Sequence, residues 1–367
     1  MVTIFFSMSG EGRGHATRVS AVVEQLRRDH KIVLFASAQA FDLLVARYPA
    51  VSNVEVRRIP GLQFSYRNGR LDYFRSLWQS VPFIRRMGNH IAQLQRAIED
   101  SQPDLIVTDF EPLMPRAAAR CGRPFVSFDH QHFLTTYDLS GLSAGLRRRA
   151  WWMGQFVEAF YRGQSHSVVS SFYFPPLKPT ADNVTQIGVL LRPSILQSQG
   201  EVGEHLLVYL RRFAAEQTLQ TLRSCGREVH VYGLGERPSE SNVRFFPINE
   251  TRFVESLATC RALISNAGNQ LVGEALYLRK PVLAFPETGN FEQAVNAHFL
   301  RECGGGDWLH EHEFAPASLE SFLERTEDLR LRIDTTRVCG NADALAALRQ
   351  HLPAETEHPS RSVALVA

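Results

Sequence analysis

The sequence predicts an α/β protein with two parallel-sheet domains that face a central cleft. The chain has 367 residues, more than twice the ~150 residues of a common single domain. Short apolar runs alternate with amphipathic stretches in two separate series, and a proline-rich segment lies between the series. Buried strands that alternate with helices are typical of parallel sheets covered on both faces. Open sheets of this kind bind ligands at the carboxyl ends of their strands.

The first series begins with the apolar run 2–7, a glycine cluster and the stretch 16–28. Apolar residues recur at helical spacing in 16–28, so this order predicts a strand, a loop and a helix. Further buried strands are expected at 32–36, 104–108 and 125–128.

The second series repeats this alternation of strands and helices. Strands are expected at 206–210, 228–232, 243–246, 262–265 and 281–285, with helices at 213–224, 251–260 and 269–279. Prolines and polar residues predict a hinge or linker between the series. The expected parts are a first domain at 1–175, a linker at 176–204, a second domain at 205–345 and a tail at 346–367. Residues 316–350 are mostly helical in pattern, and disorder is expected from Pro353.

The composition is that of an ordinary globular protein, with 44% hydrophobic and 21% charged residues. It excludes a disordered, collagen-like or disulfide-stapled chain. No apolar run approaches the ~20 residues of a membrane span, and the N-terminus lacks a signal-peptide pattern, so a cytoplasmic or membrane-peripheral protein is expected. The five cysteines lie far apart, and no metal site is expected. Residues 1–175 carry a net charge of +7, and residues 176–367 carry −5.

A glycine-rich loop joins the first strand to the first helix. It contains Gly10, Gly12, Arg13 and Gly14, followed by His15. Glycines allow close approach of the backbone to a ligand, and a helix N-terminus attracts anions. A dinucleotide fingerprint would need glycine in place of His15, and a P-loop would need a Gly-Lys-Ser/Thr ending, so the loop fits neither pattern.

Three residues near this loop are candidates for catalysis. His15 lies in the first helical turn, where the neutral imidazole is favoured and can act as a general base; the alternative is a His that caps the helix or binds phosphate. Asp109 ends the strand at 104–108, so both side chains could reach the same sheet edge, where a carboxylate orients a histidine. The alternative for Asp109 is a turn or capping carboxylate, and Glu111 is a second acid nearby.

A third polar cluster, which includes His130 and His132, follows the strand at 125–128. The spacing of these histidines with Asp129 invites a metal interpretation, but no further ligand cluster supports it. Contacts with an acceptor substrate, or hydrogen bonds within the loop, are the expected roles.

The most specific segment begins at the end of the strand 262–265. Small polar residues there precede another helix N-terminus, which is ready to bind an anion. Deeper along this helix Glu274 could accept two ribose hydroxyls, and a later loop presents Glu292 and Gln293. These polar side chains suit a hydroxylated ligand.

The strings S-N-A-G-x5-E-A-L from Ser265, K-P-V-L-x-x-P from Lys280 and F-E-Q-x-x-N-A from Phe291 resemble the donor-binding half of GT-B glycosyltransferases. The nearest groups are the MurG-like family 28 enzymes and an uncharacterised prokaryotic relative whose N-terminus also reads G-E-G-x-G-H. The resemblance extends to about residue 345. It implies a GT-B fold, that is, two Rossmann-like domains facing a cleft, and the use of a nucleotide-diphosphate sugar.

The resemblance also implies roles for individual residues. The loop Ala267–Asn269, which includes Gly268, would cradle the donor diphosphate, Glu274 would hold the ribose, and Glu292 with Gln293 would bind the sugar. The base would lie near Phe246 and Ile248. Leu271 stands three positions before Glu274, where the family often has a hydroxyl residue, so the diphosphate would rely on Asn266, Asn269 or Arg211. Gln270 completes the expected donor site. His15, supported by Asp109, would deprotonate the acceptor hydroxyl, and the Gly10–His15 loop would face the sugar and the acceptor.

The expected activity is therefore an inverting, metal-independent transfer from a UDP-sugar to an acceptor hydroxyl, with no cofactor and no nucleic acid. Two alternatives stay open: an enzyme like UDP-N-acetylglucosamine 2-epimerase, and a non-catalytic nucleotide-sugar binding module. The basic and aromatic segments 57–90 and 147–161 lie in the acceptor half. They suit either an anionic membrane surface with a lipid-linked acceptor, or a helix that packs its aromatics into the core.

Overall fold

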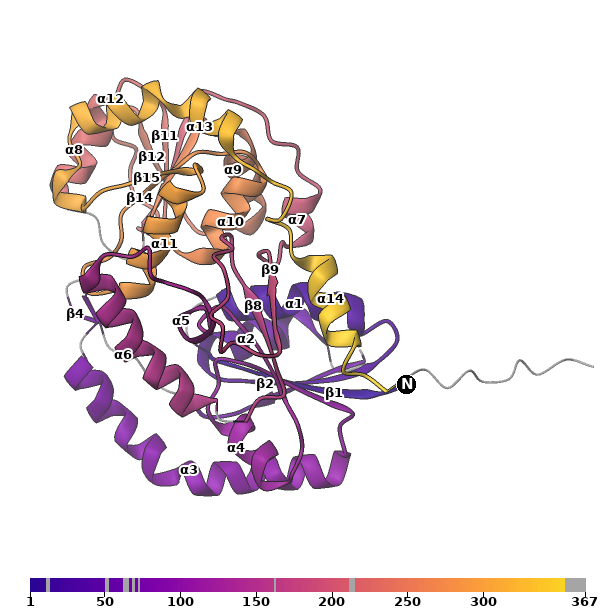
Figure 1. Ribbon diagram of the computed structural model, residues 1–367. Helices are drawn as coiled ribbons and strands as arrows, with labels where there is room; N and C mark the ends of the chain where they lie inside the picture. The colour runs from indigo at the N-terminus through magenta and orange to yellow at the C-terminus, as the bar shows by residue number, and fades with distance from the viewer. Residues whose placement is uncertain are drawn as a thin grey trace, which may run out of the picture.

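The expected architecture of two parallel sheets is confirmed in the computed structural model (Figure 1). Within the described residues one sheet has seven strands and the other has six, and every pair of neighbouring strands in them is parallel. The structure describes residues 1–10, 14–49, 53–61, 66–67, 70–71, 73–161, 163–210 and 215–353.

The N-terminal sheet has the strand order β3-β2-β1-β6-β7-β8-β9. Its central strands are buried along nearly their whole length because helices cover both faces. Successive side chains point to opposite faces, so Ile4 and Phe6 pack on one side and Phe5 on the other. The strands are β1 (Thr3–Met8), β2 (Lys31–Ala36), β3 (Val54–Arg58), β6 (Leu105–Asp109), β7 (Val126–Asp129), β8 (His166–Ser170) and β9 (Val184–Ile187).

Two groups of helices cover the faces of this sheet, as the layers in Figure 1 show. The helices α1 (Gly14–Leu26) and α2 (Ala38–Arg47) pack against Ile4 and Phe6. The opposite face is covered by α3 (Tyr73–Ser101), α4 (Leu113–Arg120), α5 (Phe133–Thr136) and α6 (Ala144–Phe160). A short hairpin, β4 (Tyr66–Arg67) and β5 (Arg70–Leu71), precedes α3.

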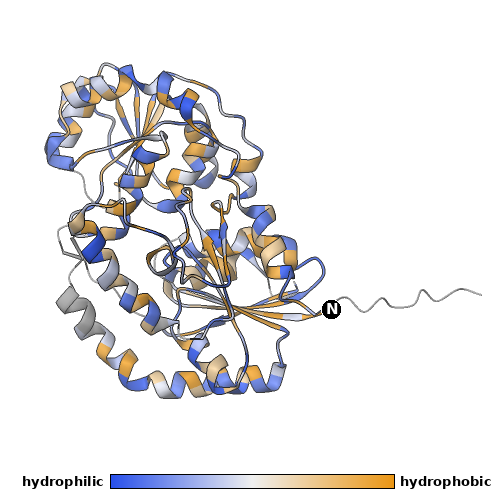
Figure 2. Cartoon of the chain, viewed as in Figure 1, coloured by the Kyte–Doolittle hydropathy of each residue, from blue (hydrophilic) through white to orange (hydrophobic). Residues whose placement is uncertain are grey.

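The C-terminal sheet has the strand order β12-β11-β10-β13-β14-β15. Its strands appear in Figure 2 as mainly hydrophobic ribbons, whereas the helices around them are mixed. The strands are β10 (Leu206–Tyr209), β11 (Val229–Tyr232), β12 (Val243–Phe246), β13 (Ala262–Ser265), β14 (Val282–Ala284) and β15 (Gly306–Trp308). The helical segments are α8 (Glu216–Ser224), α9 (Glu250–Thr259), α10 (Asn269–Tyr277), α11 (Phe291–Glu302), η1 (Glu311–Glu313), α12 (Pro316–Glu324) and α13 (Thr326–Arg332).

Two crossings of the chain join the sheets, and they differ from the expected linker and tail. The range 176–204 contains β9, the edge strand of the N-terminal sheet, and α7 (Pro193–Leu196). The last helix, α14 (Asn341–Arg349), returns to the N-terminal unit and packs against α1. Consequently the N-terminal unit extends beyond residue 175, and it also includes a helix that the sequence assigns mainly to the second domain.

The two crossings lie against each other. The side chain of Asn341 forms hydrogen bonds at 2.8 Å with both the N–H and the carbonyl of Leu191. A Cβ at Gly340 would lie 2.2 Å from the carbonyl oxygen of Gly188, so only glycine allows this approach. This close backbone contact fixes where the chain leaves and re-enters the N-terminal unit.

The strands expected at 2–7, 32–36, 104–108 and 125–128, and the five expected in the second half, are confirmed to within about a residue at each end. The helical pattern of 316–350 is also confirmed, with α12, α13 and α14. The strands β3, β8, β9 and β15 of the two sheets, and the hairpin strands β4 and β5, were not predicted from the sequence. The expected tail from Pro353 lies almost wholly outside the described residues.

Candidate functional site

The structure brings His15 and Asp109 together, as the sequence predicts. His15 lies in the first turn of α1, the helix that follows β1 in the chain, and Asp109 ends the neighbouring strand β6, in register with Met8. Nδ1 of His15 is 3.0 Å from Oδ1 of Asp109. The Asp109 carboxylate is fully buried, whereas the His15 side chain stays partly exposed. The imidazole therefore presents its free edge to the outside while a carboxylate holds the other edge.

Arg18, which was not among the residues predicted from the sequence, completes this group. Its Nε donates to Oδ2 of Asp109 at 3.2 Å, and its Nη2 donates to Oδ1. Burial by itself would raise the pKa of Asp109, but the charges of Arg18 and His15 outweigh burial and lower it. The His-x-x-Arg spacing on one helix face was the available signal, because residues three apart are neighbours there.

Nδ1 of His15 has two partners of opposite kind. In the tautomer with its proton on Nδ1, that N–H donates to Oδ1 of Asp109 and leaves Nε2 free to accept a proton. In the other tautomer, Nδ1 accepts from Nη2 of Arg18, which lies 3.1 Å away. Asp109 and Arg18 thus meet the ring at the same nitrogen, and the general-base role needs the first tautomer.

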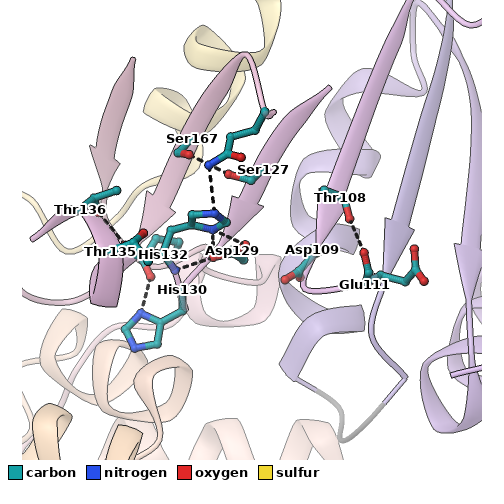
Figure 3. Close-up of polar contacts among 12 residues, drawn as sticks. Thr108, Asp109, Glu111, Ser127, Asp129, His130, His132, Thr135, Thr136 and Ser167 are labelled. Atoms are coloured by element: carbon teal, nitrogen blue, oxygen red, sulfur yellow. Dashed lines mark hydrogen bonds and ion pairs between the residues drawn. The ribbon is translucent and has the colours of Figure 1, made fainter. Parts of the chain in front are cut away.

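Glu111 faces the start of α4. Its two carboxylate oxygens accept hydrogen bonds from the N–H groups of Leu113 at 2.7 Å and Met114 at 2.9 Å. Burial raises the pKa of Glu111 to about 7 although these two N–H groups favour the charged form. Figure 3 shows Glu111 beside Thr108, whose hydroxyl donates to the Glu111 carbonyl. Both oxygens of this acid are occupied in capping a helix.

The cluster after β7 is buried among its own partners (Figure 3). Asp129 accepts hydrogen bonds from the backbone N–H of His132 at 2.9 Å and from its Nδ1 at 2.8 Å. Nδ1 of His130 lies 2.9 Å from the carbonyl oxygen of Ser170, and burial lowers the pKa of His130. His132 thus bonds within its own loop, whereas His130 bonds to β8 and, through Nε2, lies 3.2 Å from Oδ1 of Asn296 in the C-terminal unit.

Two asparagines of the C-terminal unit bond across to the N-terminal unit. Nδ2 of Asn269 donates to the carbonyl of Ser170 at 3.1 Å, and the hydroxyl of Tyr173 donates to Oδ1 of Asn296 at 2.9 Å. Nδ2 of Asn296 in turn donates to the carbonyl of Ala267 at 2.9 Å. The side chain of Asn269, expected near a diphosphate, is thus occupied in the contact between the two units.

Glu274 is held by Arg192, a residue that the sequence analysis did not select. Nε of Arg192 donates to Oε1 of Glu274 at 3.0 Å, and Nη2 donates to Oε2 at 2.6 Å. Gln270 adds a hydrogen bond to Oε1 at 3.1 Å and another to the carbonyl of Leu190 at 2.8 Å. Glu274 is only 1% exposed, so this charge is buried but fully paired.

A cleft of about 460 Å³ lies between the two units at these residues. Its N-terminal wall comes from α1 and α2, beginning at Gly14. Its C-terminal wall includes Arg192, Gln270 and Glu274, together with the half-exposed Ile248. The size and the mixture of apolar and charged walls fit a small polar ligand.

The other described residues predicted to bind the donor belong to the C-terminal unit but do not line this cleft, apart from Ile248. Asn266 donates to the carbonyl of Phe285 at 3.1 Å, Ala267 is buried, and Gly268 directly precedes α10. Phe246 stacks on Tyr232, with ring centroids 5.3 Å apart. Gln293 is buried and accepts from the N–H of Glu287, whereas Glu292 beside it is partly exposed.

In the glycine loop, Gly10 approaches Ser37 so closely that a Cβ would lie 2.1 Å from its carbonyl oxygen. The predictions for Gly12, Arg13 and Arg211 fall outside the described residues. Among the residues that are described, no group of three or more His, Cys, Asp or Glu side chains is arranged to hold a metal ion. Nor does any described helix have the length and apolar character needed to cross a membrane.

Comparison with known proteins places this geometry in a family context. The model of the family described as Glycosyl transferase family 1 matches residues 2–327. An uncharacterized glycosyltransferase of Methanosarcina mazei is 23% identical over 388 residues, which cover 96% of this chain and 98% of the relative.

Solved structures with the same fold include three glycosyltransferases. The calicheamicin glycosyltransferase CalG4 has a TM-score of 0.64 at 20% identity and covers 96% of this chain and 98% of its own. The glycosyltransferase of kitacinnamycin has a TM-score of 0.66 at 18% identity and covers 95% and 99%. Acinetobacter baumannii MurG has a TM-score of 0.63 at 14% identity and covers 95% and 100%. The two facing sheets are the GT-B arrangement.

Proposed function

The chain belongs to glycosyl transferase family 1 and is a GT-B glycosyltransferase, and on that premise we propose that it transfers a sugar from a UDP-sugar to an acceptor hydroxyl with inversion. The observation that carries the mechanism is the pair of His15 and the buried Asp109 at 3.0 Å. Gly14, next to His15, lines the same cleft as Glu274. A general base next to one wall and a carboxylate on the other wall suit a reaction between two substrates.

The donor would occupy the C-terminal wall of the cleft. Glu274 would accept the ribose hydroxyls, taking them in place of some of its hydrogen bonds from Arg192. Arg192 would then be free to approach the diphosphate, and backbone N–H groups at the N-terminus of α10 would stabilise the same negative charge. The nucleobase of the donor would lie near Phe246 and Ile248.

The chemical step uses the tautomer of His15 that carries its proton on Nδ1 and shares it with Asp109. Nε2 removes the proton from the acceptor hydroxyl while the acceptor oxygen attacks the anomeric carbon. The bond between that carbon and the diphosphate breaks on the opposite face, and the nucleoside diphosphate leaves with the electron pair. Asp109 stabilises the imidazolium that forms, and Arg192 with the start of α10 stabilises the leaving group. The configuration at the anomeric carbon is inverted.

A nucleotide screen tests the donor assignment. We expect UDP and UDP-sugars to raise the melting temperature of the full chain more than GDP or TDP, because a ligand that binds the folded state stabilises it. Release of UDP from each UDP-sugar, measured with a panel of hydroxyl acceptors, then identifies turnover. A stronger stabilisation by GDP or TDP would overturn the choice of UDP, and UDP release that no acceptor accelerates would overturn transfer.

A further inference from the structure

Helix α6 (Ala144–Phe160) has apolar residues on two opposite sides, and the protein covers only one of them. Ala150 and Val157 are buried on the inner side, where α6 packs against α5. Trp151, Trp152 and Phe156 are 57%, 59% and 57% exposed. Contiguous large apolar side chains on a protein surface mark an interaction site. The exposed side of α6 carries three such side chains without cover from the described residues.

The exposed residues form a continuous surface, here called the outer face of α6: Arg148, Arg149, Trp151, Trp152 and Phe156. Arg148, Trp152 and Phe156 follow one another at intervals of four, so they form a single row along the helix. The rings of Trp151 and Trp152 touch edge to face, with centroids 4.9 Å apart. In Figure 2, α6 carries hydrophilic and hydrophobic residues in turn.

The charge of this face is positive. Arg148 and Arg149 are exposed, and neither has an ion-pair or hydrogen-bond partner in the part of the chain that the structure describes. The third arginine of the run, Arg147, donates to the carbonyl of Ser140. Glu158, near the opposite end of the helix, is the acidic residue of α6. The N-terminal half of the chain is itself positive, with a net charge of +7 over residues 1–175.

We propose that the outer face of α6 docks the N-terminal unit onto an anionic lipid surface. Tryptophan and arginine together are typical of helices that lie in the membrane interface, because the indole rings enter the headgroup region while the cations meet anionic lipids. Lipid is the occupant that fits, because indole rings and exposed arginines on one side of a helix complement both the headgroup layer and its negative charge.

The position of α6 puts this surface beside the contact between the two units. Besides α5, the helix contacts α11, which belongs to the C-terminal unit. A membrane that contacts the outer face of α6 would lie on the side of this helix that faces away from α5. This last step rests on the proposed function: an enzyme docked in this way is placed to receive an acceptor that is held in the lipid layer.

Vesicle sedimentation tests the docking without any nucleotide or acceptor. The full chain is mixed with vesicles of phosphatidylcholine, or of phosphatidylcholine with phosphatidylglycerol. We expect binding to the anionic vesicles that falls with added salt, and a loss of at least about tenfold in affinity for the double variants W152A/F156A and R148Q/R149Q. Trp fluorescence shifted to the blue on binding is a second readout.

The control is L331A, which removes an exposed leucine (68%) from α13 in the C-terminal unit and should bind as the wild type does. Melting temperatures show whether each variant is folded. Equal binding to both kinds of vesicle, no binding by the wild type, or unchanged binding of W152A/F156A would each overturn the docking. UDP-induced stabilisation is measured separately, so failure of the docking surface is distinguishable from failure of the donor site.

Discussion

The guanidinium of Arg18 bonds to both oxygens of the buried Asp109 carboxylate. Asp109 in turn holds Nδ1 of His15, so a cation on α1 fixes the carboxylate that orients the proposed base. A carboxylate this deeply buried needs a charged partner to stay ionised. The geometry therefore assigns Arg18 a positioning role and leaves the proton transfer to His15.

Replacement of His15 by alanine is expected to lower the rate of UDP release with acceptor by about 10² to 10⁴, the usual contribution of a general base. UDP binding should stay within about twofold, because His15 belongs to α1 of the N-terminal unit, whereas the proposed donor residues belong to the C-terminal wall of the cleft. Steady-state kinetics and a UDP melting shift measure the two effects. Retention of full turnover in H15A would assign the proton transfer to another group.

Replacement of Arg18 by alanine should destabilise the fold by about 3 to 5 kcal/mol, because it leaves the buried Asp109 charge unpaired. Urea denaturation measures this change in the free energy of unfolding. The double variant R18Q/D109N removes both charges and should recover part of the loss. As a matched control, R57A breaks the half-exposed pair of Arg57 and Glu55 and should cost less than about 1 kcal/mol. Equal losses in R18A and R57A would contradict the role of burial.

Replacement of Glu274 by glutamine should weaken UDP binding by about tenfold or more, because a neutral amide is a poorer acceptor for ribose hydroxyls than a carboxylate. At a UDP concentration that raises the free energy of unfolding of the wild type by about 2 to 3 kcal/mol, the free energy of unfolding of the variant should rise much less. E320Q, at an exposed position of α12, is the control. A full UDP shift in E274Q would place the ribose elsewhere.

The acid Glu111 predicts a pH dependence of stability. Its pKa in the folded state is about 7, above the ordinary 4.5, so the folded protein binds this proton more tightly than the unfolded chain does. Its contribution to stability is therefore present below pH 4.5 and is lost as the pH rises from 4.5 through 7. The loss is on the order of 3 kcal/mol. Urea denaturation from pH 5 to pH 8 should show a steeper decline for the wild type than for E111Q.

The control for this pH series is E324Q, at an exposed position, which should follow the wild-type curve. Arg116 is the charged neighbour that partly favours the ionised form of Glu111. Parallel curves for the wild type and E111Q would mean that Glu111 titrates near its ordinary value.

Most strands, and the pair of His15 and Asp109, could be predicted from the sequence because their signals are local. Apolar runs mark β1 and β6, and residues at the carboxyl ends of parallel strands meet at one sheet edge, which brings Asp109 to His15. The omitted strands β3, β8, β9 and β15 are short or polar at one end, and β3 carries Arg57 and Arg58 in its second half. Their pairing comes from the neighbouring strand and not from their own composition.

The sequence by itself determined the two parallel sheets, the family resemblance, and the residue types that converge at the cleft. Only the tertiary structure decided which partner each polar side chain has. Arg192 reaches Glu274 across 82 residues, and Asn269 reaches Ser170 across 99. It also decided that Trp151 and Trp152 lie outside the core. The physical reason is that apolar periodicity specifies which elements form, whereas burial and pairing of a given charge or ring depend on how distant elements pack.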